Sequence, residues 1–432
     1  MIFSGKGRIH LDGQKHLTDS SLPMELKDFE YVYLPLLNMN ATSFEVVVKP
    51  GDHVNIGDLV AFRNDHFYVP IYASVSGTVE SIDKMMSSSL VYAQHVKIKN
   101  DKKYTRKKAS LNMDVNKAEK KEIVEAIKQA GITGCGGSGF PTYVKYSGDT
   151  LITDLLINGV ECEPFITIDY HYMQMYREDL ITGIKFLLKA SGAKKATIAF
   201  KKGKDALAAA LLPLVEEETN IEIKLVPDVY PMGWERTLVK EIFNKKFDKL
   251  PNEVGIIVNN STTVIKVGQA LTRGLDYTTG CTLSGNCLNQ PTDVIVPTGT
   301  KVSDIMPLIG GYKTKVVDNS AQLIAGGPMM GKALVTDEIA LNTYNNAIIF
   351  LDAKELHELP CLRCSRCVDY CPSGLQPVAI KNAEMAKDVE LLKKLKADTC
   401  VSCGLCSYIC PSRIQVTDYT SKGKDRVLKA SK

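Results

Sequence analysis

The sequence has no long apolar segment. No stretch approaches the roughly 18 consecutive apolar residues that a membrane-spanning helix requires. The first residues, MIFSGKGRIHLDG, also lack the apolar core of a secretory signal peptide. We therefore expect a protein of a reducing cytoplasm, with no transmembrane segment of its own. The net charge is only +4, which gives no reason to expect nucleic-acid binding.

Disulfides are not expected in such a compartment, yet the chain has twelve cysteines. Eight of them lie in two C-terminal copies of the pattern C-x2-C-x2-C-x3-C-P, namely CLRCSRCVDYCP and CVSCGLCSYICP. In this ferredoxin pattern three thiolates line one loop and the fourth reaches the other cluster. Zinc ribbons also use C-x2-C pairs, but not this spacing with its terminal proline. We predict two [4Fe–4S] clusters: cluster one on Cys361, Cys364, Cys367 and Cys410, and cluster two on Cys400, Cys403, Cys406 and Cys371.

The N-terminal part carries a repeated strand-and-turn rhythm. FEVVVKPGDHVNIGDLVA and PIYASVSGTVESID are typical of biotinyl and lipoyl barrel-sandwich modules. Such carriers present a lysine at a hairpin tip, and the corresponding segment FRNDHFYVPIYAS has none. We expect the fold without the carrier chemistry. The basic run NDKKYTRKKAS that follows is interpreted as a solvated linker, with a docking patch for an acidic partner as the alternative.

Strand-like and helical segments alternate from about residue 113 to residue 270. Strands are predicted in DLLING, KATIAFKK, IEIKLVP and VGIIVNN, and helices in NKAEKKEIVEAIKQAG and over 172–190, 205–217 and 235–246. This alternation predicts an α/β domain with a largely parallel sheet. Residues 271–345 change to strand and turn signals, which fit a small β-grasp module.

The segment GITGCGGSGF places four glycines within six positions. It contains G-x-G-x-x-G, but a dinucleotide fingerprint of this form follows a strand and opens a helix. Here a helix precedes the loop and a proline follows it, so the Rossmann interpretation fails. So many glycines are better explained by backbone amides that closely approach a phosphate or a flat ring. Cys135 has no ligand spacing to another cysteine, and we interpret it as a small filling side chain.

Polar side chains follow the predicted strands at NGVECEP and VNNSTT, and Glu235 lies near a helix start in VPDVYPMGWERTL. Strand ends are where open α/β sheets bind ligands. Any one of these segments could be a satisfied turn, but together they favour a site.

These segments resemble a known family. GITGCGGSGFPTYVKY is similar to the flavin loop of the FMN- and NADH-binding subunit of respiratory complex I, and NGVECEP and VNNSTT are similar to its next two flavin segments, in the same order. The order of modules resembles the C subunits of Rnf electron-transport complexes over nearly the whole chain. The resemblance implies a multidomain α/β fold with these parts: a barrel-sandwich module in 1–100, a basic linker in 101–112, an FMN/NADH-binding domain in 113–270, a soluble-ligand-binding β-grasp module in 271–345 and an all-α ferredoxin-like domain in 346–432.

The resemblance also implies site residues. An FMN site would comprise Gly134, Gly136, Gly137, Gly139, Lys145, Asn158, Glu161, Cys162, Glu163, Asn259, Asn260 and Thr263. Glu235 matches one of two adjacent glutamates near the nicotinamide in the complex I subunit, and Trp234 stands where the other would be. Val160 and Cys135 replace an aspartate and an arginine of that pattern, as is usual in the Rnf branch.

The implied function is that of an NADH-oxidising subunit at the cytoplasmic face of a membrane complex. NADH would be the substrate, with FMN and the two clusters passing single electrons to partner subunits. One alternative is a soluble reductase of the same family that serves cobalamin or amino-acid reductases, since YPMGWER is closer to those relatives. The other is an electron-relay adaptor that has lost nucleotide binding, which Trp234 would favour.

Overall fold

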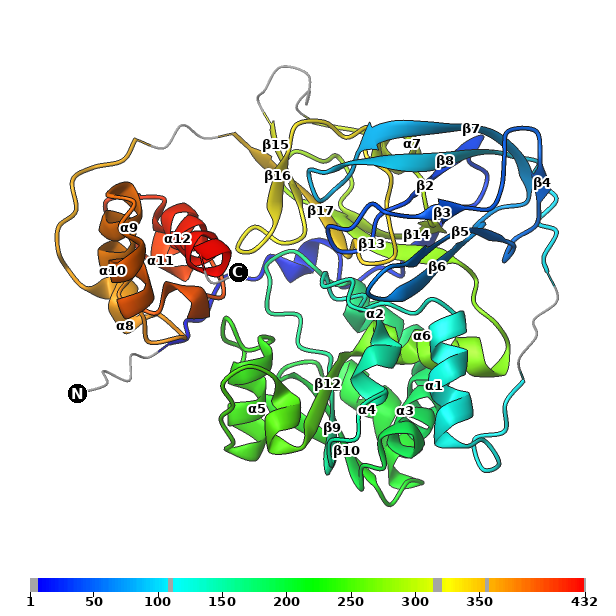
Figure 1. Cartoon of the computed structure of the whole chain (residues 1–432), viewed down its shortest axis with the longest axis horizontal. Coiled ribbons are helices and arrows are strands. Elements are labelled where there is room, and N and C mark those ends of the chain that lie inside the picture. Colours follow the sequence, from blue (N-terminus) through cyan, green and yellow to red (C-terminus); the bar gives the residue numbers. More distant parts are fainter. Residues whose placement is uncertain (1–6, 108–111, 314–320, 354–356, 431–432) are drawn as a thin grey trace.

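The computed structural model describes residues 7–107, 112–313, 321–353 and 357–430. Figure 1 shows an N-terminal β module beside a second sheet, an α/β domain below them and a separate helical module at the C-terminal end. In the described part of the chain, no helix has both the length and the apolar character needed to cross a bilayer.

The N-terminal module is a sandwich of two antiparallel sheets. One sheet has the order β2-β8-β7-β4, and the other has the order β3-β5-β6. Alternate side chains of both sheets, such as Val32, Leu34, Val60 and Val79, share one core. The strands are β2 (Tyr31–Pro35), β3 (Glu45–Val46), β4 (His53–Val54), β5 (Leu59–Asn64), β6 (Tyr68–Tyr72), β7 (Gly77–Met86) and β8 (Tyr92–Asn100).

The expected linker begins as part of this module. Ile56 donates its N–H to Thr105 O and accepts from Lys107 N, both at 2.9 Å. Arg106 forms a surface ion pair with Asp276 at 3.0 Å. Residues 108–111 of the predicted linker lie outside the described residues.

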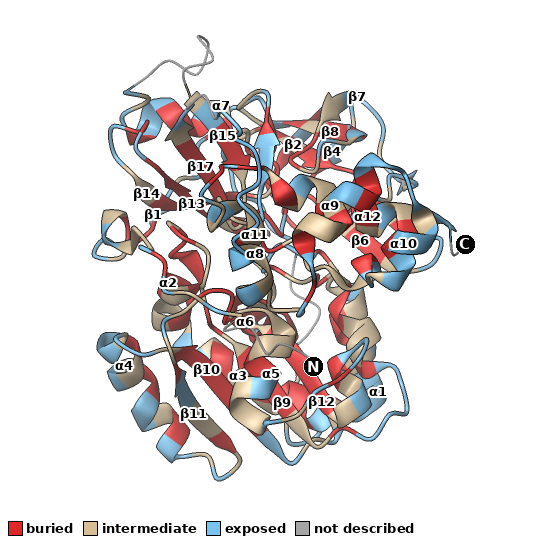
Figure 2. Ribbon diagram, turned by 90° about the vertical axis from the view of Figure 1, so that its left-hand side faces the viewer, coloured by how far each residue is buried: buried red, intermediate tan, exposed pale blue. Residues whose placement is uncertain are grey.

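The α/β domain contains a four-stranded, wholly parallel sheet with the order β11-β10-β9-β12. Its strands are β9 (Asp154–Asn158), β10 (Lys195–Lys201), β11 (Ile221–Val226) and β12 (Ile256–Asn260). Helices cover both faces because β9 is apolar on both: Leu155 and Ile157 pack in one core cluster and Leu156 packs in another. Figure 2 shows β9, β10 and β12 mostly buried, whereas the edge strand β11 is partly exposed.

The helices of this domain are α1 (Lys120–Gln129), α2 (Ile168–Met175), α3 (Arg177–Ser191), α4 (Asp205–Glu216), α5 (Glu235–Phe243) and α6 (Ser261–Thr272). The helices predicted at 116–131, 205–217 and 235–246 are present, and the helix at 261–272 was not predicted. The single helix predicted over 172–190 is wrong, because Tyr176 leaves helical geometry at φ −120° and ψ 38° and separates α2 from α3. Residues Thr142–Tyr146, which gave no helix signal, form a short 3-10 helix.

A six-stranded mixed sheet, with the order β1-β14-β13-β17-β15-β16, lies beside the sandwich. Its strands are β1 (Met24–Glu25), β13 (Thr278–Ser284), β14 (Thr292–Pro297), β15 (Ala321–Ala325), β16 (Lys332–Leu334) and β17 (Ala347–Asp352), with the short helices α7 (Val302–Ile305) and Met306–Ile309. Two of these strands lie outside the expected 271–345 module. β1 comes from the N-terminal region and β17 follows the expected boundary at residue 345, and both pair within the sheet.

The C-terminal module is helical, as predicted. It comprises α8 (Arg366–Asp369), α9 (Pro377–Met385), α10 (Val389–Lys394), α11 (Leu405–Tyr408) and α12 (Val416–Ala430), with a 3-10 turn at Ala397–Thr399. Its small core includes Leu375, Ile380, Leu392 and Val427, and one cysteine of each motif, Cys371 and Cys400, packs against it.

Candidate functional site

A cavity of about 350 Å³ opens at the carboxyl ends of β9 and β12. From β9 the chain continues to β10 and β11 on one side of the sheet and then to β12 on the other side, so the gap between β9 and β12 is a topological switch point. Open parallel sheets bind ligands at such points. We call this cavity the switch-point cavity. Eleven of the thirteen predicted FMN and nicotinamide residues line it: Gly134, Gly136, Lys145, Asn158, Glu161, Cys162, Glu163, Glu235, Asn259, Asn260 and Thr263.

The glycine loop lies between α1 and the 3-10 helix that begins at Thr142. A Cβ at Gly134 would lie 2.4 Å from Ser138 Oγ, and one at Gly136 would lie 3.1 Å from Asn260 Nδ2, so both positions bring backbone close to neighbouring groups. Gly137 and Gly139 do not line the cavity. They adopt left-handed φ values of 92° and 61°, so the geometry of the turn itself requires glycine at both positions.

Cys135 points away from solvent in this loop. Its side chain is buried, and its N–H donates to Thr263 Oγ1 at 2.9 Å. Burial raises the pKa of its thiol, so the thiolate is disfavoured. A filling role fits these contacts.

Asparagine side chains meet at the strand ends. Asn158 and Asn260 are register partners on β9 and β12. Asn158 Nδ2 donates to Gly233 O at 2.9 Å, and Asn260 Oδ1 caps α6 by accepting from Thr263 N at 3.2 Å. The end of β9 is therefore fixed to the loop at Gly233, and the end of β12 to the first turn of α6.

The acidic segment of the cavity is strongly desolvated. Glu161 accepts from Asp169 N at 2.8 Å, and burial raises its pKa to about 8. Burial raises the pKa of Glu163 to about 7, and that of the Cys162 thiol to about 11. Burial therefore favours the neutral form of each of these groups more strongly than water does.

A second cavity, of about 420 Å³, adjoins the first. The two share Ser138, Phe140, Lys145, Glu235 and Val258 as lining residues. Lys145 Nζ donates to Val258 O at 2.6 Å, and burial lowers the pKa of this ammonium although the nearby Glu235 raises it. Trp234, immediately before α5, forms part of the wall of the first cavity.

Sequence reasoning missed two residues of this region. Asp169 lines the cavity and accepts from Asn260 Nδ2 at 2.6 Å and from Thr262 Oγ1 at 2.5 Å. Its position in the first turn of α2 would have been the signal, but the helix was predicted to begin later. Lys15 comes from the N-terminal segment and donates to Glu163 O at 2.8 Å, a contact that no local pattern reveals.

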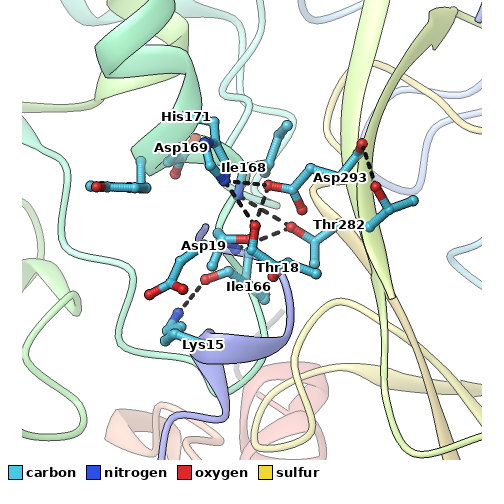
Figure 3. Close-up of polar contacts among 12 residues, drawn as sticks. Lys15, Thr18, Asp19, Ile166, Ile168, Asp169, His171, Thr282 and Asp293 are labelled. Carbon is cyan, nitrogen blue, oxygen red and sulfur yellow. Dashed lines mark hydrogen bonds and ion pairs between the residues drawn. The ribbon is translucent and has the colours of Figure 1, made fainter. Parts of the chain in front are cut away.

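Behind the cavity wall lies a buried polar network, shown in Figure 3. Thr167 Oγ1 donates to Asp293 Oδ2 at 2.9 Å and lies 2.6 Å from Thr18 Oγ1. His171 Nε2 lies 3.1 Å from Thr18 O and 3.6 Å from Asp293 Oδ2. The network joins the N-terminal segment, α2 and the six-stranded sheet.

The cysteines line two hollows in the predicted sets. One hollow has Cys361, Cys364, Cys367 and Cys410 on its walls, and the other has Cys371, Cys400, Cys403 and Cys406. Each hollow thus takes three thiols from one motif and one from the other. In the described residues no group of three or more His, Cys, Asp or Glu side chains is placed to hold a single metal ion.

Tyr230 links the second hollow to the switch-point cavity. Its Oη donates to Cys403 O at 2.6 Å and lies 3.3 Å from Glu163 Oε1, and Cys162 packs against the small apolar cluster that contains Tyr230 and Cys403. The first hollow is at the surface, because Cys361 and Cys364 are exposed.

Comparisons with protein families assign three parts of the chain. Residues 3–103 match the RnfC barrel sandwich hybrid domain, residues 127–269 the Nuo51 FMN-binding domain, and residues 360–414 a 4Fe-4S dicluster domain. They confirm the predicted sandwich, the FMN-binding domain and the two-cluster domain.

Relatives that match over most of the chain agree with these domain assignments. The chain is 30% identical over 387 residues to the C subunit of a proton-translocating ferredoxin:NAD(+) oxidoreductase complex of Clostridium ljungdahlii, covering 87% of this chain and 83% of that protein. It is 31% identical to the C subunit of an ion-translocating oxidoreductase complex of Rhodobacter capsulatus, covering 90% and 76%. An NAD+-reducing [NiFe]-hydrogenase shares the fold, with a TM-score of 0.52 at 18% identity, covering 74% of this chain and 62% of that chain.

Proposed function

The chain belongs to the RnfC family of electron-transport subunits, and from this we infer that it passes electrons between NADH and the other subunits of a membrane complex. The observation that carries the proposal is the contact between the switch-point cavity and the second cysteine hollow through Tyr230. A flavin held in the cavity would lie next to an iron–sulfur cluster. When bound, FMN accepts a hydride and releases single electrons, which couples the two kinds of carrier.

The residues present fit FMN. Glycines with no side chain line the cavity beside Asn260, and amide groups suit ribityl hydroxyls. The lining residues Asn158, Asn259 and Thr263 would hold the ribityl and phosphate parts, and Lys145 would balance negative charge on phosphate or reduced flavin. Gly137 and Gly139, which were expected to contact FMN, are assigned to loop geometry instead.

We place the dinucleotide in the second cavity. It opens from the first beside Phe140, an aromatic side chain, and Glu235, a hydrogen-bond acceptor for an amide or a ribose. Because the two cavities share these residues, a nicotinamide ring could reach the flavin while the rest of the dinucleotide fills the second cavity.

Cluster two is the proximal cluster in this proposal and cluster one the distal one. Cys403 is buried beside the cavity, whereas Cys361 and Cys364 are exposed. Electrons would therefore leave the chain, or enter it, at cluster one, where a partner subunit docks. The chain would attach to the membrane through such partners.

An anaerobic titration of the fully reconstituted chain with NADH tests the proposal. NADH should bleach the flavin and then both clusters, followed optically and by EPR. Glu235→Gln should raise the KM for NADH about tenfold or more with unchanged FMN content, since a hydrogen bond to a charged group contributes about 1.5–3 kcal/mol. Glu217→Gln, on the exposed end of α4, is the matched control. Absence of bleaching in the wild-type chain would exclude the NADH reaction and favour a relay adaptor.

The segment YPMGWER, residues 230–236, supports one alternative function: that of a reductase of the same family that passes its electrons to another acceptor. Affinity purification from solubilised membranes separates the two. Recovery with integral membrane subunits supports the complex, and recovery of the chain without them, together with activity toward a corrinoid or amino-acid reductase, supports the alternative.

A further inference from the structure

The N-terminal segment Gly7–Asp19, here called the strap, passes between the C-terminal module and the rest of the molecule (Figure 1). Gly7 N–H donates at 3.3 Å to the carbonyl of Asp369, the last residue of α8, which lies between Cys367 and Cys371. Leu11 is buried in a small apolar cluster with Cys403, Leu405 and Tyr230. One short segment therefore contacts both cysteine motifs.

The strap also fixes Tyr230. Ile9 N–H donates to Tyr230 O at 3.0 Å, and Tyr230 N–H donates to Ile9 O at 2.7 Å. The hydroxyl of the same tyrosine donates to Cys403 O. The backbone of the strap thus holds the residue that joins the cavity wall to the proximal-cluster loop.

The other end of the strap holds the acidic wall of the cavity. Gly13 O accepts from Phe165 N at 2.7 Å, and Lys15 Nζ donates to Glu163 O at 2.8 Å and to Ile166 O (Figure 3). Burial lowers the pKa of this ammonium to about 8, although the negative charge of Glu161 opposes the shift. Lys15 therefore fixes, by hydrogen bonds, the loop that carries Glu161, Cys162 and Glu163.

We propose that the strap sets the spacing between the switch-point cavity and the proximal cluster, with Leu11 and Lys15 as positioning residues for electron transfer between flavin and cluster. The proposal rests on the proposed function. Its physical basis is that one segment has hydrogen-bonded or buried contacts on both sides of the gap that the electron crosses. Loosening either end should change this gap without touching the nicotinamide side of the cavity.

The test is anaerobic stopped-flow reduction of the reconstituted full chain, with flavin and cluster bleaching recorded separately. Leu11→Ala and Lys15→Met should slow cluster bleaching about tenfold more than they slow flavin bleaching by NADH, because small misplacements cost large factors in rate. Lys15→Arg should restore most of the rate. Lys27→Met, an exposed lysine beyond β1, is the control and should behave as wild type.

Hydrogen–deuterium exchange gives a second measurement that does not depend on turnover. The strap variants should lose protection at the amides of Gly7 and Ile9 and around Cys403, and the Lys27 variant should not. If Leu11→Ala does not accumulate, Leu11→Val makes the smaller change and should show the same effects in weaker form. Lost protection with unchanged cluster bleaching would overturn the proposal, as would equal slowing of flavin and cluster bleaching.

Photoreduction of the bound flavin separates this proposal from the proposed function. If NADH fails to reduce the wild-type flavin, the NADH reaction is refuted. Electron flow from photoreduced flavin to the clusters still tests the strap, and slower flow in Lys15→Met than in Lys15→Arg would support it. Equal flow in the two variants would refute it.

Discussion

Asp293→Asn should change how stability depends on pH. The Asp293 side chain is fully buried, and desolvation raises its pKa from 3.8 to about 7 although hydrogen bonds from Thr282 and Thr167 oppose the shift. Lys15 also lowers this pKa, and Asp169 raises it further. The folded protein therefore holds a proton on Asp293 at pH values where the unfolded chain has released it.

Neighbouring His171 does not compensate the carboxylate. Its Nε2 lies 3.1 Å from Thr18 O, and a carbonyl only accepts, so Nε2 carries the proton of the neutral ring. Charging the ring would add a proton at Nδ1, a buried atom with no hydrogen-bond partner among the described residues. Burial accordingly lowers the His171 pKa. Asp293 thus ionises where His171 is already neutral.

The sign follows from proton binding. Between about pH 4 and pH 7 the folded state binds more protons than the unfolded state, so the free energy of unfolding falls as pH rises. The rise in this pKa from 3.8 to about 7 contributes at most about 4 kcal/mol to the free energy of unfolding, a contribution present below pH 4 and lost by about pH 7. Asparagine has no such titration, so the variant should gain stability over wild type above neutral pH and gain little at acid pH.

The assay is thermal unfolding followed through Trp234, the single tryptophan of the chain, at about pH 5 and about pH 8. Each kcal/mol shifts the midpoint of a domain of this size by about 2–4 °C, so an increase of several degrees at the higher pH is expected. Asp149→Asn, the same change on an exposed carboxylate, should show no pH-dependent difference. A variant that is equally destabilised at both pH values would refute the reasoning, since the carboxylate would then act only as a hydrogen-bond acceptor.

Three further outcomes are expected. Cys135→Ala should keep FMN and NADH-dependent activity, measured by flavin content and turnover, because Cys135 only fills space; loss of both would contradict this. Cys371→Ser should remove the EPR signal of cluster two, and Cys410→Ser should remove that of cluster one. If each motif held its own cluster, the two results would be reversed. Gly233→Ala should weaken FMN binding by about 1–3 kcal/mol in a fluorescence titration, because its Cβ would lie 2.5 Å from Val160 O; unchanged affinity would show that the wall can move.

The sequence was most informative where function depends on local spacing. The two cysteine motifs predicted which four thiols line each hollow, because in the ferredoxin pattern the fourth thiol of each motif reaches the other site. The parallel strands were recognisable as apolar runs, and the polar residues at their ends meet at the switch point because parallel strands share one carboxyl edge.

Long-range contacts were beyond such reasoning. Lys15 and Glu163 are 148 positions apart, and nothing near either residue indicates the other. The predicted boundary at residue 345 placed β17, Ala347–Asp352, in the C-terminal module. Only the pairing with β13 and β15 shows where it belongs. The break at Tyr176 was also missed, since tertiary contacts override helical periodicity there.

The two-residue strand β1 has a consequence for how the protein is made. Met24 and Glu25 pair with Val294 and Ile295, which covers one side of β14, a strand that reads TDVIVP. Without this cover β14 would be an apolar edge strand, free to pair with another chain. Because synthesis proceeds from the N-terminus, β1 already exists when β14 leaves the ribosome. An N-terminally trimmed chain should therefore aggregate as it is produced, even if every cofactor residue is intact.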